Sequence, residues 1–139
     1  MMISKTGIHA ILALALMARL KPGEYAGAVR IADAVGAPQN YLGKLLQQLA
    51  GEGLVESQKG FGGGFRLARA AGKISLYDIV EPLERISRWN GCFLGQVKCE
   101  SHAPCAVHDR WSQIRKGYLD FLQNTTVEEV AEDTVPLSG

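Results

Sequence analysis

Apolar residues occur on nearly every side of a helix between residues 4 and 20. The apolar positions are Ile8, Ile11, Leu12, Leu14, Ala15 and Leu16. A pattern of this kind predicts a helix that is largely buried. Ser4 suits the N-cap, and Lys21-Pro22-Gly23 ends the pattern because proline cannot continue the helical hydrogen bonds.

Two shorter amphipathic segments follow, joined by a tight turn. The first has apolar residues at positions 28, 31, 32 and 35 and ends at Gly36. The second, residues 39–49, places leucines at 42, 45, 46 and 49 on one helical face. Its other face is polar and carries Gln39, Asn40, Gly43, Lys44 and Gln47. Two short helices around a glycine-containing turn predict a helix-turn-helix.

A β-hairpin is expected directly after these helices. Residues 53–58 and 65–67 resemble two short strands, and the segment between them is rich in glycine, which permits positive φ. Helix, turn, helix and hairpin in this order predict a winged helix-turn-helix. In that fold the second helix enters the major groove of DNA and the hairpin reaches the adjacent backbone or minor groove.

The rest of the chain predicts further helices. Ser75 is expected to cap a helix that runs to Leu83, and Thr126 to begin one last short turn. From Val107 to Leu122 an apolar stripe at spacings of three and four predicts a long helix that pairs with a second copy. The expected fold is mainly α with a small β-hairpin. Residues 1–74 would form the DNA-binding domain, and residues 75–139 would contain a ligand-bearing loop (91–108) and a dimerisation helix (107–123).

Charge is distributed unevenly along a chain whose formal net charge is only +1. Residues 1–74 hold nine Lys or Arg against four Asp or Glu, a net +5, whereas residues 75–139 hold six against ten, a net −4. The first half could therefore face phosphate. No signal-peptide pattern is present and the apolar run from 8 to 17 is too short to cross a bilayer, which predicts a cytoplasmic protein without a membrane partner.

All three cysteines, Cys92, Cys99 and Cys105, lie in one short stretch that also contains His102 and His108. An odd cysteine count without a secretory signal argues against disulfides and favours thiols that bind a metal or react with oxidants. Thiolates beside an imidazole suit a transition metal or an iron-sulfur cluster. Zinc and a metal-free thiol sensor remain alternatives.

Several segments resemble one bacterial family. In order they are SKTGIHAILALALMA, APQNYLGKLLQQLAGEGLVESQKGFGGGFRLAR, ISLYDIVEPLE, and then C-x6-C-x5-C followed by H-x-x-W. This order is similar to the Rrf-type winged helix-turn-helix transcriptional regulators, the group that contains IscR, NsrR, RirA and CymR, over roughly residues 3–130.

The resemblance implies roles for individual residues. It places Gln39, Asn40, Tyr41, Gly43 and Lys44 where the recognition helix meets DNA, and Lys59 where the wing enters the minor groove, a position that is often arginine in the family. It implies Cys92, Cys99, Cys105 and His108 as cluster ligands, because the IscR branch has a histidine at the matching position of its [2Fe-2S] site.

The NsrR branch instead holds a [4Fe-4S] cluster through a carboxylate near the partner's N-terminus, and the matching residue here is Ile8. We therefore favour [2Fe-2S] over [4Fe-4S]. Six residues separate Cys92 from Cys99, one more than is usual in those branches.

The sequence thus predicts a homodimeric regulator that binds a pseudo-palindromic double-stranded operator, with an affinity controlled by a cluster that senses redox state, nitric oxide or iron. A metal-independent, zinc-based or thiol-based winged-helix regulator is the alternative. No G-x-S-x-G motif, phosphate loop or paired carboxylates indicate an enzyme, so an electron carrier or enzyme with a small-molecule substrate is less favoured.

Overall fold

The computed structural model describes residues 3–88 and 107–133, and for Arg88 and His108 the backbone alone. Its elements follow in the order α1 (Lys5–Met17), α2 (Ala28–Val35), α3 (Gln39–Gly51), β1 (Val55–Gln58), β2 (Gly64–Leu67), the 3₁₀ turn η1 (Ala71–Lys73), α4 (Leu76–Glu84), the 3₁₀ turn η2 (Ile86–Arg88), α5 (His108–Asn124) and α6 (Val127–Glu132). The fold is mainly helical with one two-stranded antiparallel sheet, so the fold class predicted from the sequence is confirmed.

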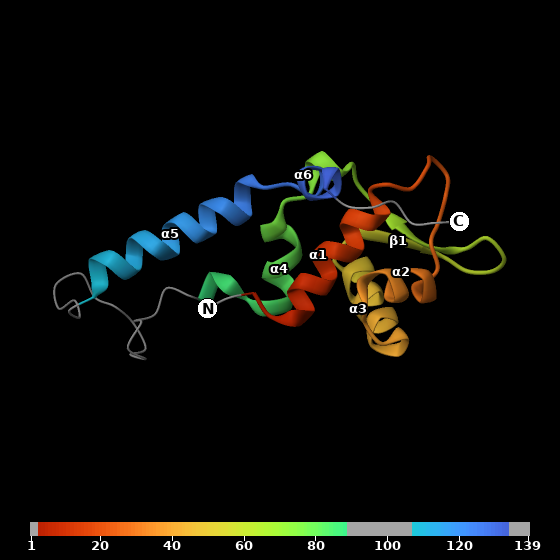
Figure 1. The fold of residues 1–139 in the computed structure, drawn as a ribbon, viewed down its shortest axis with the longest axis horizontal. Helices are drawn as coiled ribbons and strands as arrows, with labels where there is room; N and C mark the ends of the chain where they lie inside the picture. The colour runs from red at the N-terminus through yellow and green to blue at the C-terminus, as the bar shows by residue number, and fades with distance from the viewer. Residues whose placement is uncertain (1–2, 89–106, 134–139) are drawn as a thin grey trace.

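Helix α1 forms the centre of the molecule. Figure 1 shows α4 and α6 beside it, α2, α3 and the hairpin at one end, and α5 extending from the opposite side as a long arm. Ala10, Ala13, Leu14 and Ala15 are completely buried, as the all-round apolar pattern predicts. The helix ends at Met17 and not at residue 20, because the amides of Arg19 and Leu20 bond to carbonyls three residues back in a tighter turn.

Local sequence signals determine where several helices begin and end. The Ser4 hydroxyl accepts a hydrogen bond from the Gly7 amide, and Gly36 ends α2 with a φ of 82°. Ser75 and Asp78 form a reciprocal capping box at the start of α4. Side chains from both ends of the chain, among them Leu14, Leu46 and Leu122, share one hydrophobic core.

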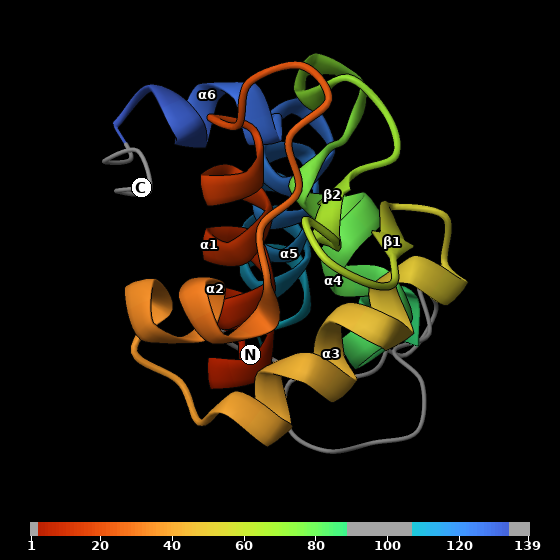
Figure 2. The ribbon, with the colours of Figure 1, turned by 90° about the vertical axis from the view of Figure 1, so that its right-hand side faces the viewer.

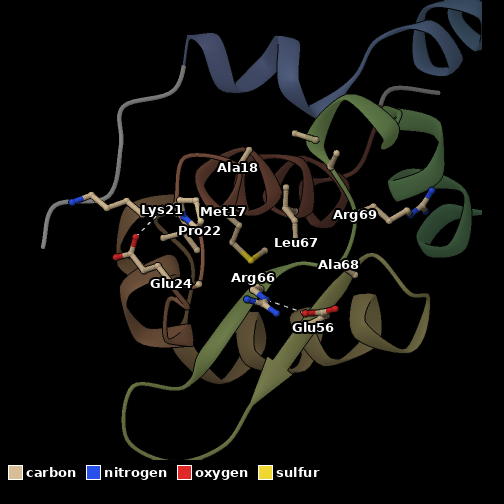
Figure 3. A pocket seen from close by; sticks show the side chains of 14 residues that line it. Met17, Ala18, Lys21, Pro22, Glu24, Glu56, Arg66, Leu67, Ala68 and Arg69 are labelled. Carbon is tan, nitrogen blue, oxygen red and sulfur yellow. Dashed lines mark hydrogen bonds and ion pairs between the residues drawn. The ribbon is translucent and has the colours of Figure 1, made fainter.

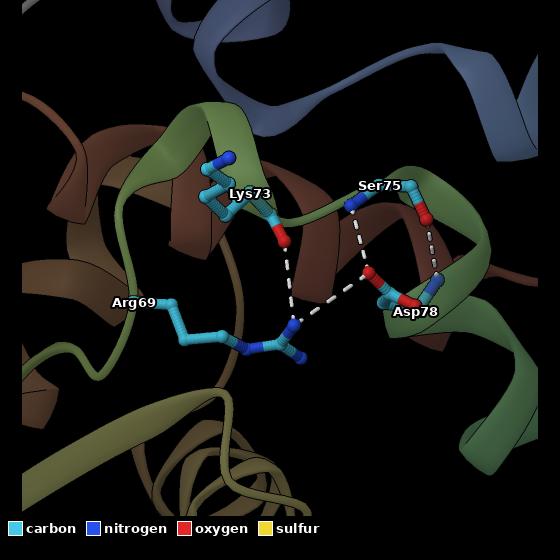
Figure 4. A network of polar contacts seen from close by, with 4 residues as sticks. All are labelled: Arg69, Lys73, Ser75 and Asp78. Atoms are coloured by element: carbon cyan, nitrogen blue, oxygen red, sulfur yellow. Dashed lines mark hydrogen bonds and ion pairs between the residues drawn. The ribbon is translucent and has the colours of Figure 1, made fainter.

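The hairpin is joined to the helices at its base. Its strands pair from Val55 opposite Leu67 to Gln58 opposite Gly64, and Phe65 also bridges to Ala26, just before α2. At the exit of β2, Arg69 Nη1 lies 3.3 Å from the Lys73 carbonyl oxygen and 4.0 Å from Asp78 Oδ2 (Figure 4). The wing is therefore tied to α2 on one side and to the capping box of α4 on the other.

A candidate nucleic-acid interface

Helices α2 and α3 and the hairpin share one face of the molecule, which is turned toward the viewer in Figure 2. A groove of about 680 Å³ lies on this face. It is lined by Ala28, Val29, Gln39, Asn40, Gly43, Lys44, Gln47 and Phe65. Four residues that the sequence predicts for DNA contact, Gln39, Asn40, Gly43 and Lys44, therefore come together in one groove.

The groove combines an apolar part with hydrogen-bonding side chains. Ala28, Val29 and Phe65 supply apolar surface, and Val29 is 52% exposed. Gln39, Asn40 and Gln47 carry side-chain amides, which can pair with base edges, while Lys44 can pair with phosphate. Apolar surface of this kind suits the methyl group of thymine. Sequence reasoning did not single out Val29, because its place in the groove depends on how α2 packs against α3.

The amino ends of α2 and α3 both contribute to this groove. Their N-caps are Gly27 and Pro38, and neither helix has a side chain that caps its first amides. Free amides at a helix N-terminus carry partial positive charge and favour phosphate. The groove is thus suited to an anionic backbone as well as to base edges.

Tyr41 lies on the neighbouring face of α3 and is turned toward α1. Its hydroxyl lies 3.1 Å from Thr6 Oγ1 and 3.1 Å from His9 Nδ1, and the His9 ring packs against the Tyr41 ring edge to face at 5.6 Å. These contacts fix the orientation of α3 relative to α1. A DNA contact by Tyr41 stays a prediction, whereas its position between two helices is a structural fact.

Lys59, the predicted wing residue, is exposed directly after β1, at the tip of the hairpin. Residues 60–63 form a turn there, in which the Gly63 amide donates to the Gly60 carbonyl at 3.0 Å. Figure 2 shows the hairpin tip on the same face of the molecule as α2 and α3, whose residues line the groove.

A second hollow, of about 380 Å³, lies between the end of α1 and the base of the wing. Figure 3 shows Arg66 paired with Glu56 across its wall at 2.9 Å, and the Glu24 carboxylate accepting from the Lys21 amide. The Arg66 guanidinium also lies over the Tyr25 ring, 4.5 Å from its centroid. The Arg66 contacts thus join β2 to β1 and to Tyr25 at the base of the wing.

The predicted metal ligands lie outside the residues whose side chains are described. Cys92, Cys99 and Cys105 fall in residues 89–106, and His108 is described only by its backbone at the start of α5. Within residues 3–88 and 107–133, no group of three or more His, Cys, Asp or Glu could hold a metal ion. In the same ranges no helix is long and apolar enough to cross a membrane.

Comparisons with known proteins agree with this architecture. The Rrf2 family, described as iron-dependent transcriptional regulators, matches residues 3–133. A relative from Aquifex aeolicus (strain VF5), named "Putative HTH-type transcriptional regulator", is 33% identical over 132 residues, which are 94% of this chain and 91% of the relative.

Two solved structures are also similar. CymR, the global cysteine regulator of B. subtilis, superimposes with a TM-score of 0.80 at 25% identity, over 97% of this chain and 99% of CymR. T. potens IscR has a TM-score of 0.75 at 25% identity, over 96% of this chain and 88% of IscR. With the family match over residues 3–133 and a winged helix whose α3 lines a polar groove, the chain belongs to the Rrf2 family of transcriptional regulators.

Proposed function

We propose that the protein is a homodimeric transcriptional regulator whose affinity for a double-stranded operator depends on an iron-sulfur cluster held by Cys92, Cys99, Cys105 and His108. The observation that carries the DNA-binding part is the shared face of the groove and the wing tip (Figure 2). The family's description as iron-dependent supports the metal-binding part.

The donor set fits such a cluster. Three thiolates leave one of four coordination positions for another group, and an imidazole replaces thiolate in known cluster types. His108 is the first residue of α5, so a regular helix fixes the backbone that carries the imidazole. When bound, a cluster would supply a one-electron redox centre that is also sensitive to iron supply and nitric oxide. We favour [2Fe-2S] over [4Fe-4S] because Ile8 stands at the position of the carboxylate that completes the [4Fe-4S] site in the NsrR branch.

A cluster-free thiol regulator is the second candidate. The structural similarity to CymR, which has also been solved in an oxidized form from Staphylococcus aureus, favours this alternative. Clustered thiols that reach solvent can report oxidants without metal, and Cys3His could also bind zinc. Iron and sulfide content identifies the cluster case, and zinc content separates the zinc site from the metal-free thiol regulator.

The contacts around α4 suggest how the predicted ligand-bearing loop, residues 91–108, could influence DNA binding. Glu81 in α4 accepts hydrogen bonds from the Ser87 amide at 2.9 Å and from its hydroxyl at 2.7 Å, just before residues 89–106. Three residues later, Glu84 Oε1 accepts from the Ser4 amide at 2.8 Å, at the start of α1. A change that begins near residue 89 can therefore reach α4 through Ser87, and from α4 it can reach the start of α1 through Glu84.

Helix α1 continues the series to the DNA-facing helix. Thr6 and His9 hold the Tyr41 hydroxyl, and Tyr41 belongs to α3. Glu84 Oε2 is buried without a hydrogen-bond partner among the described residues. A buried oxygen without a partner is energetically unfavourable, and a small shift of α4 could relieve this cost. A coupling of about 1 to 3 kcal/mol between cluster state and operator would change affinity roughly 5- to 150-fold.

Exposed apolar residues on α5 support the homodimer. Ile114 is 64% exposed and Phe121 is 53% exposed, although Leu122 beside it is completely buried in the core. The Tyr118 and Phe121 rings are stacked with centroids 6.5 Å apart. We propose that a second copy covers this surface, because a two-fold pair of recognition helices would match a pseudo-palindromic operator.

The experiment is an anaerobic purification with visible absorption and iron and sulfide counts. It is repeated on Cys92→Ala, Cys99→Ala, Cys105→Ala and His108→Ala, with Ser112→Ala on α5 as the control. Wild-type protein should contain iron and sulfide, the four ligand variants should lose absorption, and the control should keep it. If wild-type protein is colourless and binds the operator with the same affinity as the four ligand variants, a metal-independent regulator is supported instead.

The coupling route is tested with Glu84→Gln, and with Glu132→Gln as an exposed control on α6. Operator affinity is measured for each variant with and without the cluster. The ratio of the two affinities should fall toward one in Glu84→Gln and stay at the wild-type value in Glu132→Gln. Equal ratios in all three proteins would exclude Glu84 from the route.

A further inference from the structure

Phe61 lies at the tip of the wing with its side chain fully exposed, so it contributes no packing to the core. The hydrogen bond from the Gly63 amide to the Gly60 carbonyl closes a four-residue turn in which Phe61 is the second residue. Gly62, the third residue, has a φ of 77°, as a type II turn requires. The turn thus presents a large aromatic side chain at the outermost point of the hairpin.

The backbone on the return side of this turn is crowded. A Cβ at Gly63 would collide with the Gln58 carbonyl oxygen, and a Cβ at Gly64 would collide with the carbonyl oxygen of Ala26. Phe65 and Ala26 exchange two backbone hydrogen bonds, of 2.8 and 2.9 Å. The hairpin is therefore fixed to the segment that leads into α2, and α2 lines the groove.

The surroundings of Phe61 indicate what it meets. Exposed Lys59 lies two residues before it. The wing tip shares its face of the molecule with α3, which supplies Gln39, Asn40 and Lys44 to the groove (Figure 2). A protein that places α3 in the major groove brings the tip of its wing to the adjacent strand or minor groove. A cation there favours the negative potential of a narrow minor groove. An aromatic ring that is carried to the same place meets the edges of stacked base pairs.

We propose that Phe61 acts as a wedge, inserting its ring between neighbouring base pairs from the minor groove and bending the operator. Apolar wedges of this kind partly unstack a base step and kink the duplex by about 20 to 90°. The inference rests on the proposed DNA-binding function and adds a mode of recognition to it. Because pyrimidine–purine steps unstack most easily, the operator should carry such a step where each wing lies.

The test uses the full-length protein and the duplex that wild-type protein selects from a random library. Bending is measured by energy transfer between dyes at the duplex ends, and unstacking by the fluorescence of 2-aminopurine placed at the expected step. Phe61→Ala is compared with Lys59→Ala, which removes the charge at the tip but keeps the ring. Thermal unfolding checks that both variants fold.

Phe61→Ala should lose the bend and the 2-aminopurine signal, with affinity reduced by about 5- to 150-fold, the range for losing one stacked aromatic ring. Its melting temperature should not change, since the ring is fully exposed. Lys59→Ala should keep the bend, bind more weakly and show a smaller salt dependence.

A bend and a 2-aminopurine signal that persist in Phe61→Ala would overturn the wedge while leaving DNA binding intact. A change in self-association without a change in bending would also overturn it and would assign Phe61 to a protein contact. If wild-type protein selected no duplex, the proposed DNA-binding function would fail and the wedge with it.

Discussion

Gly43 stands in the interior of α3, where glycine weakens a helix by about 0.8 to 1.0 kcal/mol relative to alanine. Packing within the chain does not require it. A Cβ built at Gly43 meets only the Cβ of Ala28, at 4.0 Å, which is ordinary van der Waals contact, and its φ is not positive. Gly43→Ala should therefore raise the free energy of unfolding by about 1 kcal/mol, or the melting temperature by about 3 °C.

The same substitution should weaken operator binding. Gly43 lines the groove, and a methyl group there would occupy the space into which we expect a base edge to fit. The loss should be of the size of one mismatched base pair, about 1 to 3 kcal/mol, which is roughly 5- to 150-fold in affinity. Stability and affinity should thus change in opposite directions.

Thermal unfolding and fluorescence anisotropy on the selected duplex measure the two effects. Gly51→Ala is the matched control, because Gly51 ends the same helix, its Cβ would meet nothing within 4 Å, and it does not line the groove. The control should keep wild-type affinity. A stabilised Gly43→Ala protein with unchanged affinity would refute a close approach of DNA at this position, and a destabilised one would refute the packing argument.

Three further predictions concern α3 and α4. Tyr41→Phe, which removes the hydroxyl between Thr6 and α3, should lower the free energy of unfolding by about 1 to 2 kcal/mol and weaken operator binding, measured by urea unfolding and anisotropy. Ser75→Ala should lower the free energy of unfolding, measured in urea, by about 1 kcal/mol, because it removes the side-chain cap of α4. Ser57→Ala, at an exposed position, should leave this free energy unchanged. Burial raises the pKa of Glu81, but hydrogen bonds from Ser87 and Tyr77 outweigh it, so the pKa lies below its ordinary value of 4.5. A lowered pKa stabilises the fold above pH 4.5, and this contribution is lost as the pH falls through the folded-state pKa. Glu81→Gln should therefore flatten the acid side of a plot of the free energy of unfolding against pH. A slope equal to that of wild type would contradict this.

Short-range signals were sufficient for most helix boundaries. Ser4, Gly36 and Ser75 mark helix ends through contacts within a few residues, and the structure has each of these caps. The contact between Glu84 and the Ser4 amide could not be foreseen, because 80 residues separate the two and no local pattern pairs them. Hydrophobic periodicity identifies the faces of a helix but not the element that covers each face.

The candidate site shows the same limit. Helical periodicity put Gln39, Asn40 and Lys44 on one polar face, and the structure places all three in the groove. It could not show that the neighbouring Tyr41 turns toward α1, because this depends on the angle between two helices. Nor could it identify Phe61, since no periodic pattern reaches the tip of a turn.

The crowded backbone beside the wing turn restricts how this regulator can diverge during evolution. Gly60, Gly62 and Gly64 have positive φ, and side chains at 63 or 64 would strike carbonyl oxygens. At the hairpin tip, mutations at the exposed positions 59 and 61 can alter the hairpin's chemistry without disturbing its backbone. Related regulators that recognise different promoters should therefore vary at position 61 of the wing while position 59 stays basic and the surrounding glycines persist.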